Sequence, residues 1–140
     1  MRMIPRSHWD IARNAIITKK KLTHLFLLLS SKRLANAPPV TSTEYRQWTG
    51  RRLNRFKESV KKIEEQLDKI PQSKSYIRVP DKFFKIPLKN TFELLVIHYV
   101  VTKNHDSKMR NKYFFQEFAE RYGVNPTRQN KYKFNKIIKK

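Results

Sequence analysis

The clearest hydrophobic pattern of the chain lies within residues 41–70, where apolar side chains recur at alternating spacings of three and four residues. This is the spacing of the a and d positions of a heptad repeat, and it predicts a helix with one apolar seam. About two and a half heptads are too few for a stable coiled coil. The seam therefore packs either against another helix of the chain, as an antiparallel hairpin, or against a helix of a partner protein. The predicted protein-interface positions are Leu53, Phe56, Val60, Ile63 and Leu67, and Ile70 completes the seam.

The start of this segment carries the signals of a helix N-terminus. Thr41 followed by Glu44 has the form of a capping box, in which the hydroxyl accepts a hydrogen bond from a backbone N–H of the first turn. Gly50 is a poor helix former. We therefore expect Tyr45 and Trp48 to lie on a separate short helix that precedes the heptad helix.

The first 34 residues have an amphipathic and basic pattern. Ser7–Asp10 has the form of a capping box, and the apolar residues that follow recur at helical spacing, so the pattern predicts a helix over residues 7–33. Three consecutive lysines interrupt its apolar stripe, and the helix either kinks there or exposes a basic collar. Residues 1–34 contain a single acid among many cations. Such a composition is typical of a mitochondrial targeting helix, and the alternative is a basic helix of the mature protein.

The rest of the chain reads as an extended segment followed by helices. Residues 72–90 are predicted to be extended, as edge strands or a loop, because their prolines remove ladder hydrogen bonds. Residues 91–140 are predicted to form a helical end with a basic tail. Within them, residues 92–101 fit both a helix and a strand, and we choose the helix. Residues 107–122 predict another helix, closed by Gly123 in a left-handed conformation.

These segments predict a single small domain over residues 1–140 with a mainly α fold: a helical hairpin, proline-rich extended segments, a C-terminal helix pair and basic termini. The longest uninterrupted apolar run is far shorter than the roughly 18 residues that a membrane span needs. We therefore expect no membrane span.

The net charge of the chain indicates the class of partner that it binds. The chain has 32 Lys and Arg against 11 Asp and Glu, a formal charge of +21, which predicts binding to nucleic acid or, as a weaker alternative, to an anionic membrane. The cations are spread along the whole sequence. A DNA-binding domain usually concentrates its cations on one face or one helix, whereas a chain woven into folded RNA meets phosphates on several sides. The spread along the sequence favours RNA.

The densest basic clusters give the candidate binding residues. The C-terminal segment alternates cations with aromatic and aliphatic residues, a pattern in which the cations contact phosphates while an aromatic stacks on an unpaired base or anchors the segment to protein. The predicted RNA-binding residues are Lys19, Lys20, Lys21, Arg51, Arg52, Arg55, Arg128, Lys131, Tyr132, Lys133, Lys136, Lys139 and Lys140.

The same C-terminal region also matches part of a helix-turn-helix. With Phe115 as its first position, Phe118 fills a buried apolar position and Gly123 falls at the turn, and a second helix starts with Pro126 at its first position. Gln129 departs from the motif, because a buried aliphatic residue belongs there. A plain helical end with a basic tail is the competing interpretation.

No residues are arranged for catalysis or for a cofactor. The chain has no cysteine and only two glycines, so thiol chemistry and glycine-rich phosphate loops are excluded. None of the four histidines has a metal-binding spacing. We expect no enzyme activity, no cofactor and no small-molecule substrate.

In composition the chain resembles the small, basic, lysine- and aromatic-rich accessory proteins of mitochondrial ribosomes. We therefore expect a structural RNA-binding component of a ribonucleoprotein particle, a subunit of the mitochondrial ribosome in the matrix. Its partners would be ribosomal RNA and neighbouring ribosomal proteins. The alternatives are a DNA-binding helix-turn-helix regulator and a helical accessory or assembly subunit of a mitochondrial membrane complex. A cytoplasmic or nuclear location is the alternative to the matrix.

Overall fold

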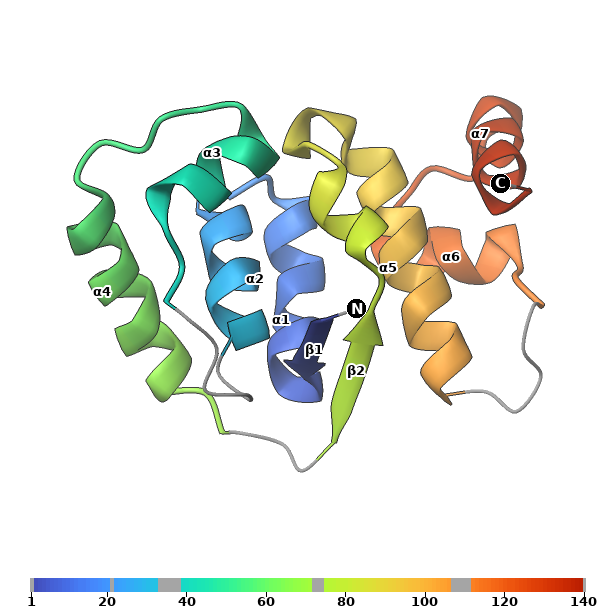
Figure 1. Cartoon of the computed structure of the whole chain (residues 1–140). Helices are drawn as coiled ribbons and strands as arrows, with labels where there is room; N and C mark the ends of the chain where they lie inside the picture. Colours follow the sequence, from blue (N-terminus) through green and yellow to red (C-terminus); the bar gives the residue numbers. More distant parts are fainter. Residues whose placement is uncertain (1, 21, 33–38, 72–74, 107–111, 140) are drawn as a thin grey trace.

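A computed structural model describes residues 2–20, 22–32, 39–71, 75–106 and 112–139 (Figure 1). These residues form seven α-helices, two short 3-10 helices and one two-stranded sheet, so the mainly α prediction is confirmed. In chain order the elements are β1 (Arg2–Pro5), α1 (Arg6–Ile17), α2 (Thr23–Lys32), α3 (Ser42–Thr49), α4 (Phe56–Asp68), β2 (Tyr76–Val79), η1 (Asp81–Lys85), η2 (Leu88–Asn90), α5 (Thr91–Asp106), α6 (Phe115–Tyr122) and α7 (Arg128–Ile138).

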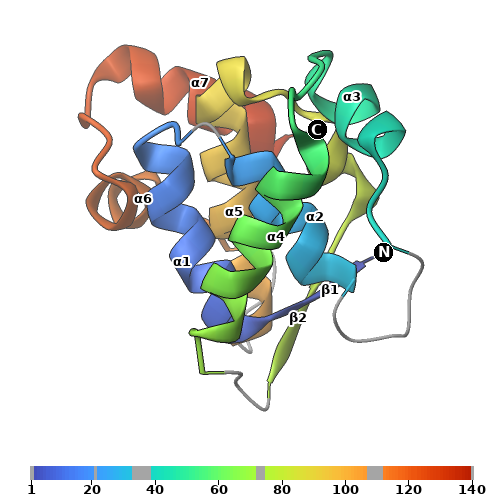
Figure 2. The same ribbon diagram turned by 90° about the vertical axis from the view of Figure 1, so that its left-hand side faces the viewer.

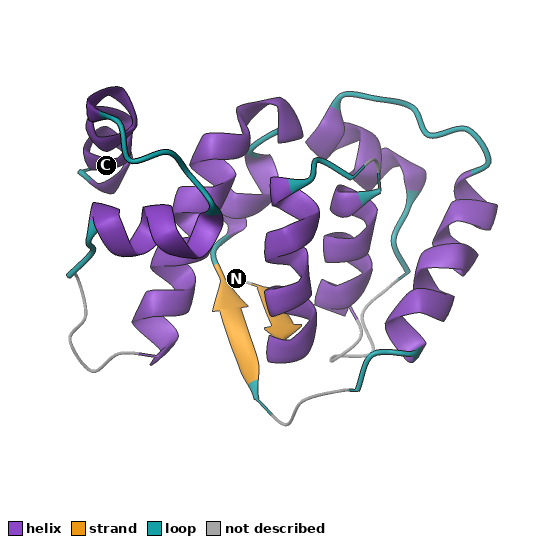
Figure 3. Cartoon of the chain, turned by 180° about the vertical axis from the view of Figure 1, so that it is seen from behind, coloured by secondary structure: helices purple, strands orange, loops and turns teal. Residues whose placement is uncertain are grey.

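Four helices stand side by side in the order α4, α2, α1 and α5 (Figure 1). The small sheet lies against α1, α2 and α5, and α6 and α7 pack beside α5 at the far side of the molecule. The view from behind shows the same row in reverse order (Figure 3). The helices α1 and α2 therefore form the centre of the fold.

The predicted continuous helix over residues 7–33 is wrong, because the chain reverses direction between α1 and α2. Lys19 adopts a left-handed conformation with φ of 52°, which ends the first helix. The Thr23 hydroxyl then donates a hydrogen bond of 2.7 Å to the carbonyl oxygen of Lys20 at the start of α2. The reversal lets both helices bury apolar side chains against each other instead of exposing one long stripe.

The capping box predicted at Ser7–Asp10 is also wrong. The helix α1 begins at Arg6, directly after Pro5, with no capping side chain. Asp10 instead accepts a hydrogen bond of 3.0 Å from Nε of Arg6, one turn earlier. The Thr41 half of the second predicted box is confirmed, because its hydroxyl accepts from the Glu44 backbone N–H at 3.2 Å, whereas the Glu44 carboxylate bonds to Lys32 and Arg2.

The sheet contains a strand that the sequence did not predict. Residues Arg2–Pro5 pair antiparallel with Tyr76–Val79, with Arg2 opposite Val79. Ile77 and Val79 alternate inward and are fully buried. The rest of the segment that was predicted to be extended differs from that prediction, because residues 81–85 and 88–90 form 3-10 helices rather than strands.

The heptad seam packs inside the chain. The helix α4 starts only at Phe56, so Leu53 precedes the helix, and Gly50 ends the separate helix α3 at a φ of 69°, as expected. Ile63 and Leu67 are buried in the shared core, and α4 packs against α2. The seam therefore packs within the chain, and Ile63 and Leu67 are not available to a partner protein as the interface prediction requires. The predicted antiparallel hairpin is wrong, because α3 lies between α2 and α4 in the chain and these two helices run in the same direction (Figure 1).

The C-terminal half contains the helix expected at residues 92–101, within α5. Residues 112–114 are not helical, so the next helix begins at Phe115 rather than at residue 107, and residues 107–111 lie outside the described part. Gly123 closes α6 with a φ of 64°, as predicted. The helix α7 begins at Arg128 behind the Thr127 cap, so the prediction that Pro126 occupies its first position is wrong.

An aromatic core joins the last three helices to α1. The rings of Tyr99, Phe118 and Phe134 lie within about 6 Å of one another, and all three residues are buried. The Trp9 indole stacks on His98 with 4.0 Å between ring centroids. The same indole donates a hydrogen bond of 2.8 Å to the Thr102 hydroxyl, so one buried tryptophan fixes α1 on α5.

Candidate nucleic-acid interface

Four segments that are far apart in the sequence meet at one end of the molecule. They are the turn between α1 and α2 (residues 18–20 and 22–24), residues 45–57, residues 81–90 and α7 with its cap (residues 127–139). Figures 1 and 2 both place these segments in the upper part of the molecule. We refer to this surface as the basic end.

Side-chain contacts hold the segments of the basic end together. The Trp48 indole donates a hydrogen bond of 3.0 Å to the carbonyl oxygen of Ile86, and the His24 ring meets the same indole at 4.2 Å between centroids. On the other side, the Lys133 ammonium lies 5.9 Å from the centroid of the Phe92 ring, which follows η2. Three of the segments are thus in direct contact, and α7 is joined to them through Phe92 of α5.

The basic end carries fifteen Lys and Arg residues against one carboxylate, that of Asp81, and all fifteen cations are exposed. This local excess is far larger than the chain average. The cations are Lys19, Lys20, Arg46, Arg51, Arg52, Arg55, Lys57, Lys82, Lys85, Lys89, Arg128, Lys131, Lys133, Lys136 and Lys139.

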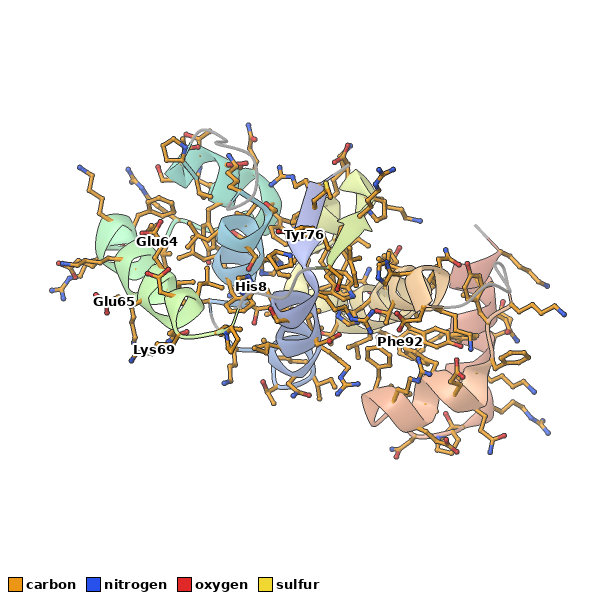
Figure 4. All side chains as sticks on the ribbon, turned by 90° about the horizontal axis from the view of Figure 1, so that it is seen from below. His8, Glu64, Glu65, Lys69, Tyr76 and Phe92 are labelled. Carbon is orange, nitrogen blue, oxygen red and sulfur yellow. The ribbon has the colours of Figure 1, made fainter. Side chains whose placement is uncertain are left out.

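Most of these cations have no acidic partner. In the described part of the chain, Arg55 is the one member of the set in an ion pair, a long 3.9 Å contact with Glu58. The well-formed pairs lie elsewhere, such as Lys32 with Glu44 and Lys103 with Glu117, each at 2.7 Å. The opposite end, seen in Figure 4, mixes the two signs, as Glu64 and Glu65 on α4 and Lys69 directly after it show. The charge of the chain is therefore segregated in space although it is spread along the sequence.

Two cations of the basic end are held in a backbone conformation that their residue types disfavour. Lys19 has a φ of 52° and Arg55 a φ of 56°, and they are the only positive-φ residues other than glycine in the described ranges. The left-handed region costs a residue with a side chain about 1–2 kcal/mol. Backbone strain of this kind concentrates at functional sites.

The structure brings together the predicted RNA-binding residues that it describes. Lys19 and Lys20 lie in the α1–α2 turn, and Arg51, Arg52 and Arg55 lie in the connection between α3 and α4. The remaining positions lie on or directly after α7. Lys21 and Lys140 are outside the described residues.

Sequence reasoning missed five cations of this surface, because they occur singly and not in runs. A signal was nevertheless present, since Lys82, Lys85 and Lys89 recur at spacings of three and four residues between buried aromatic and aliphatic residues. The other missed positions are Arg46 and Lys57.

The predicted basic tail is a helix with two distinct faces. Its inner face is anchored by Phe134, which is buried, so this aromatic contacts protein rather than a base. On the outer face, Tyr132 is 67% exposed. Arg128 and Lys136 lie one helical turn to either side of Tyr132. The outer face of α7 therefore offers one flat ring between two cations.

A buried histidine lies under the basic end without adding to its charge. Burial and, to a smaller extent, the nearby Arg51 guanidinium together lower the pKa of His24 to about 4, although a hydrogen bond from the ring to the Ile86 backbone favours the charged form. The ring is neutral at pH 7. The positive field of the surface therefore comes from lysine and arginine alone and does not change near neutral pH.

The helix-turn-helix pattern has only partial support from the geometry. The helices α5, α6 and α7 pack against one another, as in a three-helix unit. The connection from Gly123 to Thr127 spans five residues, and Gln129 is exposed where the motif has a buried aliphatic residue. Phe134, five residues later, fills the buried position instead.

Comparison with known protein families, curated proteins and solved structures finds no significant match to this chain. Within the described ranges, no group of three or more histidine, aspartate or glutamate side chains is placed to hold a metal ion. No helix in those ranges has the length and apolar character required to cross a membrane.

Proposed function

We propose that this chain is a structural RNA-binding component of a ribonucleoprotein particle. The composition of the chain best fits a protein of a mitochondrial ribosomal subunit. The observation that carries the proposal is the basic end, where fifteen exposed cations lie with one carboxylate, Asp81, inside the ranges that define it and with Glu58 directly beside it. Ribosomal RNA and neighbouring ribosomal proteins are the proposed partners.

The geometry supports a phosphate-binding mode of action. When cations that lack acidic partners contact phosphates, they displace the counterions that are condensed on the nucleic acid. The release of these counterions drives binding without base readout. Because the four segments are packed together, the cations keep a fixed spacing and favour RNA surfaces of matching shape. Tyr132 adds a ring on which an unpaired base can stack.

The N-terminal segment takes part in this fold. Ile4, Trp9 and Ile16 are fully buried, and they belong to β1 and α1 within residues 1–34. A protein cut after residue 34 would lose the centre of its core. Under the matrix localisation that we propose, the assembled protein therefore retains these residues.

A second candidate is a DNA-binding protein that uses α7. The observation that favours it is that the cations gather at one end, as they do on proteins that approach a duplex from one side. The exposed side chains of Gln129 and Lys133 on the outer face of α7 could reach base edges in a major groove. This candidate differs from the first in requiring sequence preference.

Competition binding tests both candidates. A fluorescent fragment of structured RNA is bound to the full chain and displaced by unlabelled RNA or duplex DNA of equal length at equal salt. We expect RNA to compete better than DNA. Preferential displacement by one DNA sequence would select the second candidate.

A pair of matched variants locates the surface. Replacing Arg51 and Arg52 by alanine removes two charges from the basic end, and replacing Lys61 and Lys62 by alanine removes two exposed charges from the middle of α4. We expect the first pair to weaken RNA binding at least tenfold more than the second. Equal losses would show that only net charge matters and would contradict the proposed surface.

A further inference from the structure

A groove of about 880 Å³ separates α6 from α7. Its volume falls within the range of about 300–1,000 Å³ typical of ligand sites. Both aromatic and charged side chains line it. The lining residues that matter here are Tyr113, Phe114, Phe115, Glu120, Arg128 and Lys131.

The ring of Phe114 is held at the surface rather than in the core. It is 55% exposed, although its neighbours in the chain are both partly buried. Its backbone N–H donates a hydrogen bond of 3.0 Å to the Tyr99 hydroxyl, which fixes the position of the residue. The Lys103 ammonium lies 5.6 Å from the centroid of the ring. An aromatic ring is thus presented outward on a fixed backbone.

The walls of the groove are formed before any ligand binds. Phe115 packs against the buried Phe134 with 5.6 Å between ring centroids, which ties α6 to α7. The Asn130 amide donates a hydrogen bond of 2.9 Å to the carbonyl oxygen of Asn125, and the Thr127 hydroxyl caps the first turn of α7. A preformed site loses little conformational entropy on binding.

The charge of the groove is complementary to that of a nucleic acid, because the groove is positive and the phosphates are negative. Arg128 and Lys131 line the α7 side, and both belong to the basic end. Glu120 is the one carboxylate among the lining residues. The groove therefore continues the phosphate-binding surface and adds an aromatic ring to it.

We infer that the groove takes an unpaired stretch of the bound nucleic acid, with a base stacked on Phe114 and the adjacent phosphates against Arg128 and Lys131. Aromatic rings beside cations are the combination that single-stranded nucleic acids require, because every base has a flat face and every linkage has a charge. The inference rests on the proposed function, since it assigns a second kind of contact to the same nucleic acid.

Titration with two probes tests the inference. One is a twelve-nucleotide single strand that contains 2-aminopurine, whose fluorescence falls when it stacks, and the other is a duplex of the same length. The wild-type chain should bind both and quench the single strand. Phe114→Ala should weaken single-strand binding by about 5- to 150-fold. The duplex affinity should stay within twofold, and Phe114→Trp should restore quenching.

Ile11→Ala is the matched control, because Ile11 is a 41% exposed apolar residue on α1 that does not line the groove. It should leave both affinities unchanged. A single strand that binds without quenching, or a Phe114→Ala variant with unchanged single-strand affinity, would overturn the inference while leaving the proposed function intact. Equal losses for both probes would also overturn it. A wild-type chain that binds neither probe would remove the proposed function as well.

Discussion

The Nδ1 atom of His98 lies 2.6 Å from the hydroxyl oxygen of Tyr122, in the core between α5 and α6. The other ring nitrogen, Nε2, lies 2.9 Å from the carbonyl oxygen of Trp9. A carbonyl oxygen can only accept a hydrogen bond, so Nε2 carries the proton and Nδ1 accepts from Tyr122. Burial raises the pKa of the Tyr122 hydroxyl, which keeps it a donor. One neutral imidazole therefore connects α1, α5 and α6.

This arrangement predicts that acid destabilises the fold well above the pKa of its carboxylates. Burial lowers the pKa of His98 to about 3 and that of His24 to about 4, whereas both take up protons near pH 6.5 once unfolded. The stabilisation that each neutral histidine contributes to the fold is therefore fully present above pH 6.5. It declines as the pH falls toward the pKa that the histidine has in the folded protein. Between pH 7 and pH 5 the free energy of unfolding should drop by roughly 2 kcal/mol for each.

Urea denaturation at the two pH values measures the effect. His24→Gln should remove about half of the pH dependence, and His98→Gln the same share if the variant folds. His105→Gln is the control, because His105 is exposed at the end of α5. A pH dependence that survives both core substitutions would mean that other groups cause it.

Salt should control nucleic-acid affinity steeply. If the basic end neutralises roughly six to ten phosphates, the affinity should fall by about 10³ to 10⁵ between 50 and 200 mM salt. Replacing Lys131 and Lys136 by alanine should lower the slope of log affinity against log salt by up to about two. Anisotropy titrations across this salt range give the slope. An affinity that does not depend on salt would contradict phosphate binding.

The strained cations give a test that separates binding from stability. Asparagine tolerates the left-handed region, so Lys19→Asn and Arg55→Asn should leave the free energy of unfolding unchanged or raise it by up to about 1 kcal/mol. Each should nevertheless weaken nucleic-acid binding, because a cation of the basic end is lost. Thermal melts and titrations on the same samples report both quantities. Lower stability together with unchanged binding would show that these side chains serve the fold instead.

Sequence readout by α7 can be tested at one residue. Gln129 is exposed and makes no contact that the fold requires, so Gln129→Ala should leave affinity for every RNA and DNA sequence unchanged under the RNA proposal. Asn130 is unsuitable for this test, because its amide bonds to Asn125 within the protein. A loss of preference among duplexes, with general affinity retained, would support the DNA-binding candidate.

The seam of α4 should tolerate charge at exposed positions only. Ile63 is 4% exposed, so Ile63→Asp places an unpaired carboxylate in the core, which costs several kcal/mol and should unfold the chain. Gln66→Asp adds the same charge on the exposed side of α4 and should leave the melting temperature nearly unchanged. Circular dichroism melts distinguish the two outcomes. Equal stability of both variants would contradict the packing of α4 on α2.

Local signals in the sequence were enough for several elements. The hydroxyl of Thr41 and the two glycines at positive φ act within one or two turns, so their positions predicted helix ends correctly. The spacing of Ile63 and Leu67 likewise identified the buried side of α4.

The elements that the sequence missed depend on distant partners. Residues 2–5 form a strand only because residues 76–79 pair with them, and nothing local marks them as a strand. Consecutive lysines are compatible with both a helix and a turn, so the reversal at Lys19 is decided by the packing of α1 on α2.

The candidate site was predicted residue by residue but not as one surface. The runs of cations identified Arg51 and Lys131, among others, whereas their meeting at one end depends on how α3, η1 and α7 pack. The distribution of cations along the sequence was therefore a poor guide to their distribution in space. The sequence distribution favoured RNA over DNA more strongly than the geometry does.

The pairing of Arg2 with Val79 has a consequence for how the protein is made. The first strand has no partner strand until residues 76–79 have been synthesised and have left the ribosome. Ile4 can pack only against α1 and α2 during that time, although it is fully buried in the finished fold. Pairings between residues so distant in sequence form slowly. The unpaired edge of β1 is therefore open to pairing with other strands while the chain is being made, and a chaperone or the RNA that the protein is proposed to bind would protect it.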